Sequence, residues 1–507
     1  MWDLLQPHTT ALGGVLVYGP EMTVEQVHEI KDTLRSEQPI HLRECLPFML
    51  ADRCFRKSVH SIQLRREEYM RSLVRRIWGK GIRTILDVAK YDKSAMVRMK
   101  SLKSSIVLAT CLISGAHAAT PAEFSHATAL AQAPGDVTPL QYGAKADGVT
   151  DDAVALNRMY AAARASHAAV FLRGRKYKVT GQIDARGVSS VGEGASLIFA
   201  MNSAASPNAF TWGGNDTFVT EVVFDLSNSG PSTMQGIYNG ESGASNQRFY
   251  RNRVVCETAD GSGRKANIYG AWFAGTDLTG LYVEGNQFER CSYGVQLNNQ
   301  QGIDGNVRTA PLGKPSQHIH IFNNTLIDST IGINTPHLMV SDVVIDGNTI
   351  EPKAYLLDLP LNIAHASKVT VFGNTVTSNA NSSNGTLHIE DASGSVAVIG
   401  NSVTVEGLNN GIEVLVHPGA SKDIAPATRV VVSGNHIEGA GSASGTVGIL
   451  LPDRGTVDAT IANNYVAKFS ECITSVGPSN ISSNTVASCL VPINATKSAV
   501  SSNVVRN

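Results

Sequence analysis

Histidine and carboxylate residues gather in three consecutive segments of the second half of the chain, LPLNIAH (359–365), GTLHIED (385–391) and NGIEVLV (410–416). The titratable residues in or beside these segments are Asp358 and His365, then His388, Glu390 and Asp391, then Glu413 and His417. Paired carboxylates can act on a glycosidic bond as acid, base or nucleophile, and histidine transfers protons near neutral pH. The segments therefore predict a catalytic set of Glu413, His388, Glu390, Asp391 and Asp358.

Each of these segments also fits a short strand whose side chains alternate between two faces. Similar segments recur along the chain, and their aliphatic members are assigned to the inside: Ile237, Val295, Ile333, Leu361, Leu387, Ile412 and Ile449. The next residue of each segment then faces outward, which gives the column Tyr238, Trp272, Gln296, Asn334, Asn362, His388, Glu413, Leu450, Thr474 and Asn494. Aromatic rings stack on sugar rings and amides bind hydroxyls. The column predicts a polysaccharide site, and the alternative is an ordinary polar face of a half-exposed sheet.

Substrate binding is assigned to five members of this column: Trp272, Tyr238, Gln296, Asn334 and Asn362. Arg454 is the nearest basic residue that could neutralise the carboxylate of an acidic sugar.

An asparagine-centred pattern positions these segments. It occurs ten times, for example as VEGNQF, IDGNTI and VFGNTV, with its asparagines 19 to 38 residues apart. These asparagines are Asn252, Asn286, Asn324, Asn348, Asn374, Asn401, Asn435, Asn464, Asn484 and Asn503. A repeat of this length made of short alternating strands predicts stacked coils, about 4.8 Å apart, of a right-handed parallel β-helix. The asparagines are expected at a tight bend, in left-handed backbone geometry, where they form an internal hydrogen-bonded ladder. A calcium-binding nonapeptide array would need GGxGxD runs, which do not occur.

The start of the array carries a family resemblance. YGAKADGVTDDAVALNRMYAAA (142–163), AAVFLRGRKYKV (168–179) and SSVGEGASLIF (189–199) follow one another in the order found in the pectate-lyase-like superfamily, in the group of rhamnogalacturonases, epimerases and phage tailspikes. The resemblance implies an all-β, right-handed parallel β-helix with an N-terminal capping helix.

That capping helix is expected over 151–165. Thr150 is the expected N-cap, and Asp151 and Asp152 are placed in the first turn, where negative charge favours the helix dipole. Val154 and Met159 are expected to face the first coil. Asp151 and Asp152 are therefore interpreted as structural rather than catalytic.

The reaction stays open at this stage. The NTDG, DD, GHG and RxK set of polygalacturonases is missing from the repeats, as is the DPHD of alginate epimerases. Cleavage of a pectin-like or other uronic-acid-containing glycan by a lyase or a glycoside hydrolase is expected, and a non-catalytic glycan-binding or adhesive surface protein is the alternative. No cofactor is assigned, except that a lyase would use Ca²⁺ or a basic residue to neutralise the uronate.

The segment 99–118 has the features of a secretory signal peptide. A basic flank precedes an apolar stretch (Ile106 to Gly115), and Ala116-His117-Ala118 is a small-x-small cleavage site. Export to a secreted or periplasmic location is therefore predicted, with no membrane attachment after cleavage. Residues 1–98 are interpreted as an upstream start assignment, with an authentic basic N-terminal extension as the alternative. Residues 119–135 are expected to be a linker, and 136–507 the β-helix domain.

Cysteine spacing and charge fit this organisation. Four cysteines follow the cleavage site, and their positions relative to the repeat predict the disulfides Cys256–Cys291 and Cys472–Cys489 between neighbouring coils.

Residues 1–118 carry 18 Lys and Arg against 12 Asp and Glu, whereas the remainder carries 24 Lys and Arg against 31 Asp and Glu. The mildly acidic β-helix is a poor nucleic-acid binder, so a polysaccharide is the expected partner. Oligomeric state is not predicted.

Overall fold

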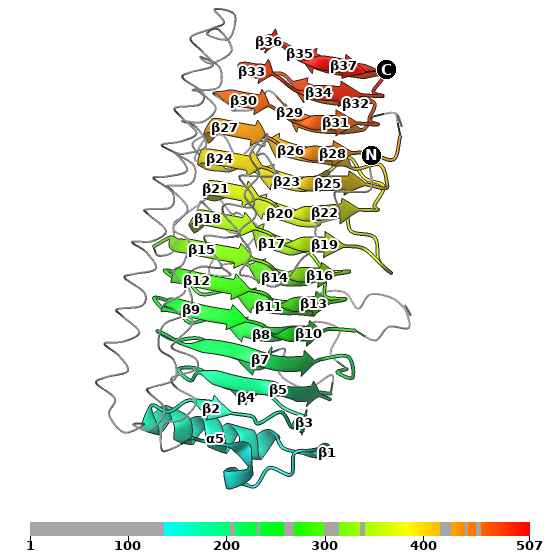
Figure 1. Ribbon diagram of the computed structural model, residues 1–507. Coiled ribbons are helices and arrows are strands. Elements are labelled where there is room, and N and C mark those ends of the chain that lie inside the picture. The colour runs from blue at the N-terminus through cyan, green and yellow to red at the C-terminus, as the bar shows by residue number, and fades with distance from the viewer. Residues whose placement is uncertain are drawn as a thin grey trace, which may run out of the picture. The chain divides into compact units, whose positions relative to one another are not determined.

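The computed structural model describes residues 136–202, 208–230, 234–257, 268–298, 314–334, 340–415, 427–441, 445–452 and 458–506. These residues form a column of stacked coils whose strands pair in parallel with the equivalent strands of the coils above and below (Figure 1). The predicted right-handed parallel β-helix is confirmed, and it is the fold that the resemblance to the pectate-lyase-like superfamily implies. Predictions for residues 1–135, including the signal segment, lie outside the described residues.

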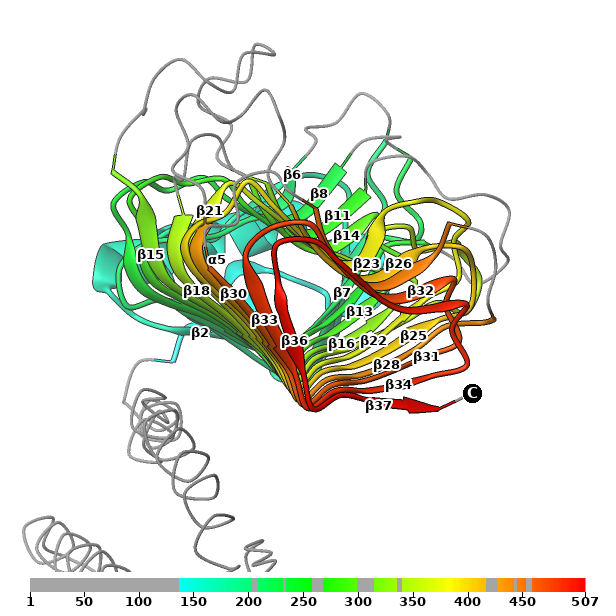
Figure 2. The same ribbon diagram turned by 90° about the horizontal axis from the view of Figure 1, so that it is seen from above.

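Most coils contain three strands, which form the faces seen end-on in Figure 2. Twelve strands, one from each coil, form a separate sheet, called sheet B below. They are β4 (Ile183–Asp184), β6 (Asn208–Thr211), β8 (Met234–Asn239), β11 (Ile268–Phe273), β14 (Tyr293–Leu297), β17 (Ile331–Asn334), β20 (Leu361–Ala364), β23 (Gly385–Glu390), β26 (Asn410–Leu415), β29 (Val447–Leu451), β32 (Glu471–Ser475) and β35 (Val491–Ala495).

The other strands form a 25-stranded sheet, sheet A, which bends once in each coil. Two long strands, β5 (Ser190–Phe199) and β7 (Phe218–Asp225), run through the bend and pair with strands on both sides of it. Before the bend lie β9 (Ser245–Tyr250), β12 (Thr279–Glu284), β15 (Ser316–Phe322), β18 (Val340–Asp346), β21 (Ala366–Phe372), β24 (Ser393–Ile399), β27 (Ala427–Ser433), β30 (Ala459–Ala462), β33 (Ser479–Ser482) and β36 (Ala499–Ser501). After the bend lie β10 (Arg253–Val255), β13 (Gln287–Glu289), β16 (Thr325–Ile327), β19 (Thr349–Glu351), β22 (Thr375–Ser378), β25 (Ser402–Val405), β28 (His436–Glu438), β31 (Tyr465–Ala467), β34 (Thr485–Ala487) and β37 (Val504–Arg506). The first coils add β1 (Asp147–Asp151), β2 (Val170–Phe171) and β3 (Lys176–Val179).

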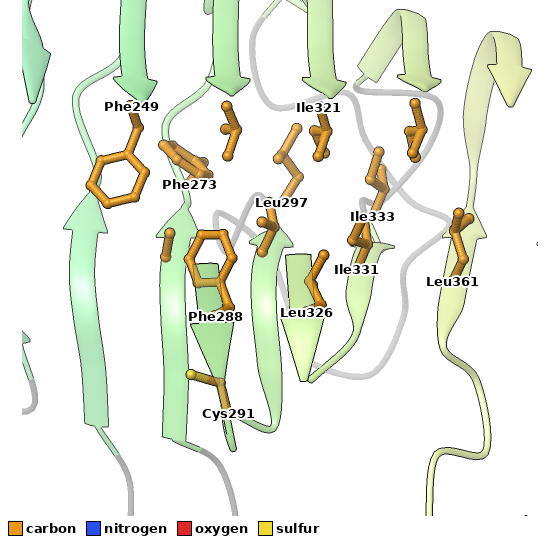
Figure 3. Close-up of a cluster of buried hydrophobic side chains, with 14 of the residues drawn as sticks. Phe249, Phe273, Phe288, Cys291, Leu297, Ile321, Leu326, Ile331, Ile333 and Leu361 are labelled. Atoms are coloured by element: carbon orange, nitrogen blue, oxygen red, sulfur yellow. The ribbon is translucent and has the colours of Figure 1, made fainter. Parts of the chain in front are cut away.

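The core is the inside of the column. Inward side chains of successive strands stack in rows, with aromatic rings in the N-terminal half that give way to Leu, Ile and Val (Figure 3). Phe249 and Phe288, from neighbouring coils, stack with ring centroids 6.3 Å apart. All seven aliphatic residues assigned to the inside of sheet B are fully buried, so that assignment is confirmed.

The asparagine ladder stabilises the bend in sheet A. Each of the first nine asparagines contacts the next one, because its backbone N–H and side-chain amide both donate to the Oδ1 of the following asparagine, at 2.9–3.2 Å. The predicted ladder is therefore confirmed.

The expected left-handed geometry of these asparagines was wrong. The residue before each asparagine has the positive φ: Arg251, Gly285, Asn323, Gly347, Gly373, Gly400, Gly434, Asn463, Ser483 and Ser502. Glycine takes this geometry without a Cβ penalty, which explains why Gly-Asn recurs in the repeat.

Helix α5 (Ala153–Ser166) covers the N-terminal end of the column, beside the 3₁₀ turn η2 (Pro139–Tyr142) (Figure 1). Its buried face includes Leu156, Met159 and Tyr160, whereas Val154 is 62 % exposed, so the inward orientation expected for Val154 was wrong. The helix begins later than predicted, because Thr150 and Asp151 belong to β1 and Asp152 is the N-cap.

Asp151 and Asp152 precede the first turn of the helix instead of lying in it, and both carboxylates accept backbone N–H groups. The Asp152 carboxylate is buried and accepts the backbone N–H of Lys145 at 2.7 Å and of Ala146 at 3.0 Å. Asp151 accepts the backbone N–H of Thr180 at 3.1 Å and that of Ala153 at 3.1 Å. The Asp152 side chain therefore fixes the turn at 145–146 against the start of α5, and the Asp151 side chain links the end of β1 to Thr180.

Both predicted disulfides are present. Cys256–Cys291 and Cys472–Cys489 join neighbouring coils with Cα–Cα distances of 5.1 and 5.7 Å. In the part of the chain that the structure describes, no helix is both long and apolar enough to cross a membrane.

Candidate functional site

The strand register of sheet B lines up one outward row of side chains, called the site row below. Each member pairs with the next through parallel strands: Tyr238, Trp272, Gln296, Gly332, Asn362, His388, Glu413 and Leu450, then Thr474 and Asn494. The predicted column is confirmed at every position except one. Asn334 does not belong to it, because Gln296 pairs with Gly332, and Asn334 lies two residues further along, next to Ala364.

Four rings form an aromatic group at the N-terminal end of the site row. Trp272 lies edge-on to Tyr238 at 6.3 Å between ring centroids and packs on Tyr269 at 4.7 Å. Tyr269 stacks in turn on Tyr293 at 5.6 Å, with the two rings 6° from parallel. Tyr269 and Tyr293 were not predicted, although the sequence signal was available: a Tyr-Gly pair precedes the outward residue in both YGAWF and YGVQL.

His388 is the centre of the charged part of the row. Its Nδ1 lies 3.1 Å from Oε2 of Glu413 on the next strand, and its Nε2 lies 3.3 Å from Oε2 of Glu390, two residues along its own strand. These three predicted residues, called the His388 centre below, are brought together because β23 and β26 pair in register and side chains at i and i+2 share a face.

The two carboxylates determine the charge of the histidine. Burial alone would lower the pKa of His388, but its hydrogen bonds to Glu390 and Glu413 outweigh burial and raise the pKa to about 9. His388 is therefore an imidazolium at neutral pH, between two acidic side chains. The side chains of His388 and Glu413 are 7 % and 9 % exposed, whereas that of Glu390 is 21 % exposed. Glu390 is thus the member most open to a ligand.

The site row is less exposed to solvent than the half-exposed polar sheet face that was the alternative interpretation of the column. Counted over whole residues, backbone included, Trp272, Gln296, Asn362, His388 and Glu413 are each at most 7 % exposed. Side chains of neighbouring strands also pack against each other along the row. A Cβ placed on Gly332 would lie 2.3 Å from Oε1 of Gln296 and 2.7 Å from the ring of Tyr293, both on the preceding strand. These neighbours fill the space left by the glycine.

The remaining predicted residues lie apart from the His388 centre. Asp391 is buried just after β23, with Oδ2 3.4 Å from Nε2 of His365, so these two form a pair of their own. Asp358 precedes β20, and its carboxylate accepts hydrogen bonds from Ser382, Asn384 and Asn409.

Arg454 and His417 lie outside the described residues. Within the described residues, no group of three or more His, Cys, Asp or Glu side chains is arranged to hold a metal ion.

No protein-family model and no curated protein sequence matches this chain. Several solved structures are similar in fold. The A-module of the mannuronan C-5 epimerase AlgE6 from Azotobacter vinelandii is 17% identical, with a TM-score of 0.42 over 73% of this chain and 99% of that chain. The catalytic unit of an α-1,3-glucanase from Streptomyces thermodiastaticus is 17% identical, with a TM-score of 0.44 over 73% of this chain and 65% of that chain. The surface adhesin PfbA of Streptococcus pneumoniae is 10% identical, with a TM-score of 0.41 over 73% and 91%. Nothing about the ligand or reaction of this chain follows from likenesses of this size.

Proposed function

We propose that the outward face of sheet B binds a polysaccharide and that the His388 centre cleaves it. The observation that carries the proposal is an imidazole held between two carboxylates on a nearly closed sheet face, in the same row as an aromatic group. A proton donor and carboxylates at hydrogen-bond distance are the groups that glycosidic bond cleavage needs.

The exposure of each group decides its role. Glu390 is the catalytic residue that contacts the substrate, because it is the most exposed of the three. His388 supplies a proton through Glu390, since its raised pKa keeps it protonated at neutral pH. Glu413 is a positioning residue: it lies behind His388, holds Nδ1 and stabilises the imidazolium.

The aromatic group provides binding at a distance from the chemistry. Trp272 and His388 are separated by four strand spacings, through β14, β17 and β20, which corresponds to about 19 Å, or roughly four sugar units. A long glycan lying along the site row would stack on the rings while its scissile bond reaches Glu390. This arrangement favours cleavage within a chain over removal of a terminal sugar.

Two disulfides support export, because such bonds persist in oxidising compartments. We therefore propose a secreted or periplasmic protein, with residues 99–118 as its signal peptide. Asp358, Asp391 and Asn334 are left without a catalytic or binding role. A lyase would additionally need a cation or Ca²⁺ at the uronate carboxylate.

One observation favours a second candidate function. Both ring nitrogens of His388 already have carboxylate partners, so the His388 centre could serve only to join β23 and β26. In that case the face binds a glycan without cleaving it.

The test uses a panel of neutral and uronic-acid polysaccharides, with reducing ends and ultraviolet absorbance of unsaturated products as readouts. Glu390→Gln should lower kcat at least about 100-fold and leave KM unchanged, because the amide keeps the shape but transfers no proton. Glu471→Gln is the matched control, since Glu471 is a carboxylate of the same sheet held by Thr474 and Asn494. Unchanged turnover in Glu390→Gln would refute the catalytic assignment, and binding that survives without turnover in any substrate would support the second candidate.

A further inference from the structure

A second row with aromatic side chains lies on the outer face of sheet A, immediately before the bend. Five strands of successive coils, β9, β12, β15, β18 and β21, lie side by side there (Figure 1). Their last residues pair in register and alternate between a ring and a carboxylate. They are Tyr250, Glu284, Phe322, Asp346 and Phe372, called the ring row below. The ring row belongs to a different sheet from the site row, and the proposed function does not use it.

The side chains of the ring row reach the solvent. Phe372 is 52 % exposed as a whole residue, the side chain of Asp346 is 31 % exposed, and the other three members are half-buried. A Cβ placed on Gly400, in the turn of the next coil, would lie 3.5 Å from Cε2 of Phe372. The most exposed ring therefore packs against the neighbouring turn and is still open to a ligand.

The asparagine ladder fixes the spacing of the ring row. In all five coils only two residues, the second of them the ladder asparagine, separate the row from the next strand. The side-chain amide of Asn374 donates to the carbonyl oxygen of Phe372 at 3.1 Å, and that of Asn348 donates to the carbonyl oxygen of Asp346 at 3.1 Å. Because the bend has the same length in each of these coils, successive rings lie two strand spacings, about 9.6 Å, apart.

A neighbouring outward row packs against the ring row. Nε2 of His320 lies 2.6 Å from Oδ1 of Asp346, and the His320 ring stacks on Phe322 with centroids 4.0 Å apart. Phe218 packs on Tyr250 at 6.1 Å between ring centroids. These contacts restrict two rings and one carboxylate before a ligand arrives, which lowers the entropy cost of ordering them on binding.

We infer that the ring row is a second glycan-binding site, separate from sheet B, and that it takes an extended β-1,4-linked glycan. In such a chain alternate sugars present the same face, at roughly the 9.6 Å interval of the rings. The rings stack on every second sugar, and the carboxylates of Glu284 and Asp346 accept hydrogen bonds from hydroxyls of the sugars between them. A ligand that repeats at this interval can contact every ring, whereas a globular surface has no such period. This inference goes beyond the proposed function and does not depend on it.

The test is calorimetric titration of the full-length protein with β-1,4-linked hexaoses of glucose, mannose and xylose, and with maltohexaose, whose α-1,4 linkages curve the chain. The row from Tyr250 to Phe372 spans four strand spacings, about 19 Å, so a hexaose covers all three rings. At least one β-1,4 hexaose should bind about tenfold more tightly than maltohexaose. Phe372→Ala should weaken that binding about fivefold, because one stacking contact is lost, whereas Phe372→Tyr keeps the ring and should keep the affinity.

A double variant and a control complete the design. Phe322→Ala/Phe372→Ala should abolish one binding event of the wild type, and Leu140→Ala, which removes a 45 % exposed apolar side chain in η2, should change nothing. Turnover by the double variant should equal that of the wild type, since sheet B is unchanged, so this inference and the proposed function fail independently. The inference would be overturned by unchanged β-1,4 hexaose binding in the double variant, by equal affinity for maltohexaose, or by no binding of any β-1,4 hexaose. A lower molar mass of Phe372→Ala in light scattering would overturn it too, because the row would then be a contact between copies of this chain.

Discussion

The charge of His388 makes folding stability depend on pH in a direction that can be worked out. The folded-state pKa is about 9, above the ordinary value of 6.5. A raised pKa means that protonation favours the folded state, so the stabilisation is fully present below about pH 6.5 and is lost as pH rises through about 9. The difference between the two pKa values corresponds to about 3 kcal/mol, and the side chain is buried enough for most of it to persist.

For a cooperative unit the size of this β-helix, about 3 kcal/mol lowers Tm by roughly 4 °C. The assay is calorimetric unfolding of the wild type and of His388→Gln between about pH 6 and pH 9.5, with the difference between the two curves as the readout. The wild type should lose its advantage as pH rises, whereas the variant has no imidazole to titrate. His436→Gln is the matched control, because the His436 side chain is 56 % exposed and lies 3.7 Å from a glutamate. If the curves of wild type and His388→Gln run parallel, His388 is not held as an imidazolium and the proton-donor role fails.

Three further predictions follow from other parts of the molecule. Asn374→Ala should lower the unfolding free energy by about 3 kcal/mol, because two buried N–H groups of Asn348 lose their acceptor. A calorimetric loss under about 1 kcal/mol would contradict the stabilising role of the ladder. Asp152→Ala should also lower the unfolding free energy by about 3 kcal/mol, since it leaves two backbone N–H groups without their carboxylate acceptor. Its turnover at room temperature should stay unchanged, and an inactive but folded variant would move the site to the capped end. Gly332→Ala should weaken glycan binding about fivefold, because the new Cβ displaces the side chains of Gln296 and Tyr293. If calorimetry gives the variant the same affinity as the wild type, these two side chains do not contact the ligand.

Alternation along each strand was sufficient to predict the inside of the column and most of the outward row. The predicted catalytic set included the three residues of the His388 centre but also Asp358 and Asp391, which have other partners. Alternation failed at β17 for a physical reason. Ile331 and Ile333 both point inward, so a slip of two residues keeps every side chain on its correct face, and only the pairing partner changes. The register of β17 therefore could not be read from its own residues, and Asn334 was placed in a row that contains Gly332.

Only two rings of the aromatic group, Trp272 and Tyr238, were predicted, because the alternation of inward and outward residues is interrupted in these strands. Gly270 and Ala271 are consecutive and both buried, so the period of two breaks between Tyr269 and Trp272. The same break separates Tyr293 from Gln296. The closure of the site row and the hydrogen bonds of Asp152 depend on side chains and backbone brought in by tertiary packing, which no local pattern specifies.

The asparagine ladder has a consequence for how this protein can change. Successive ladder asparagines are separated by as few as 19 and as many as 38 residues, yet each contacts the next in the same way. Insertions between strands are therefore absorbed away from the bend and leave the alignment of sheet B intact. The distance between the aromatic group and the His388 centre is set by the number of coils alone. Deleting residues 349–374, from one ladder asparagine to the next, would bring the two closer by one strand spacing, about 4.8 Å. Under the proposed function, whole-coil duplication or loss offers evolution and protein engineers a stepwise way to select glycans of different length.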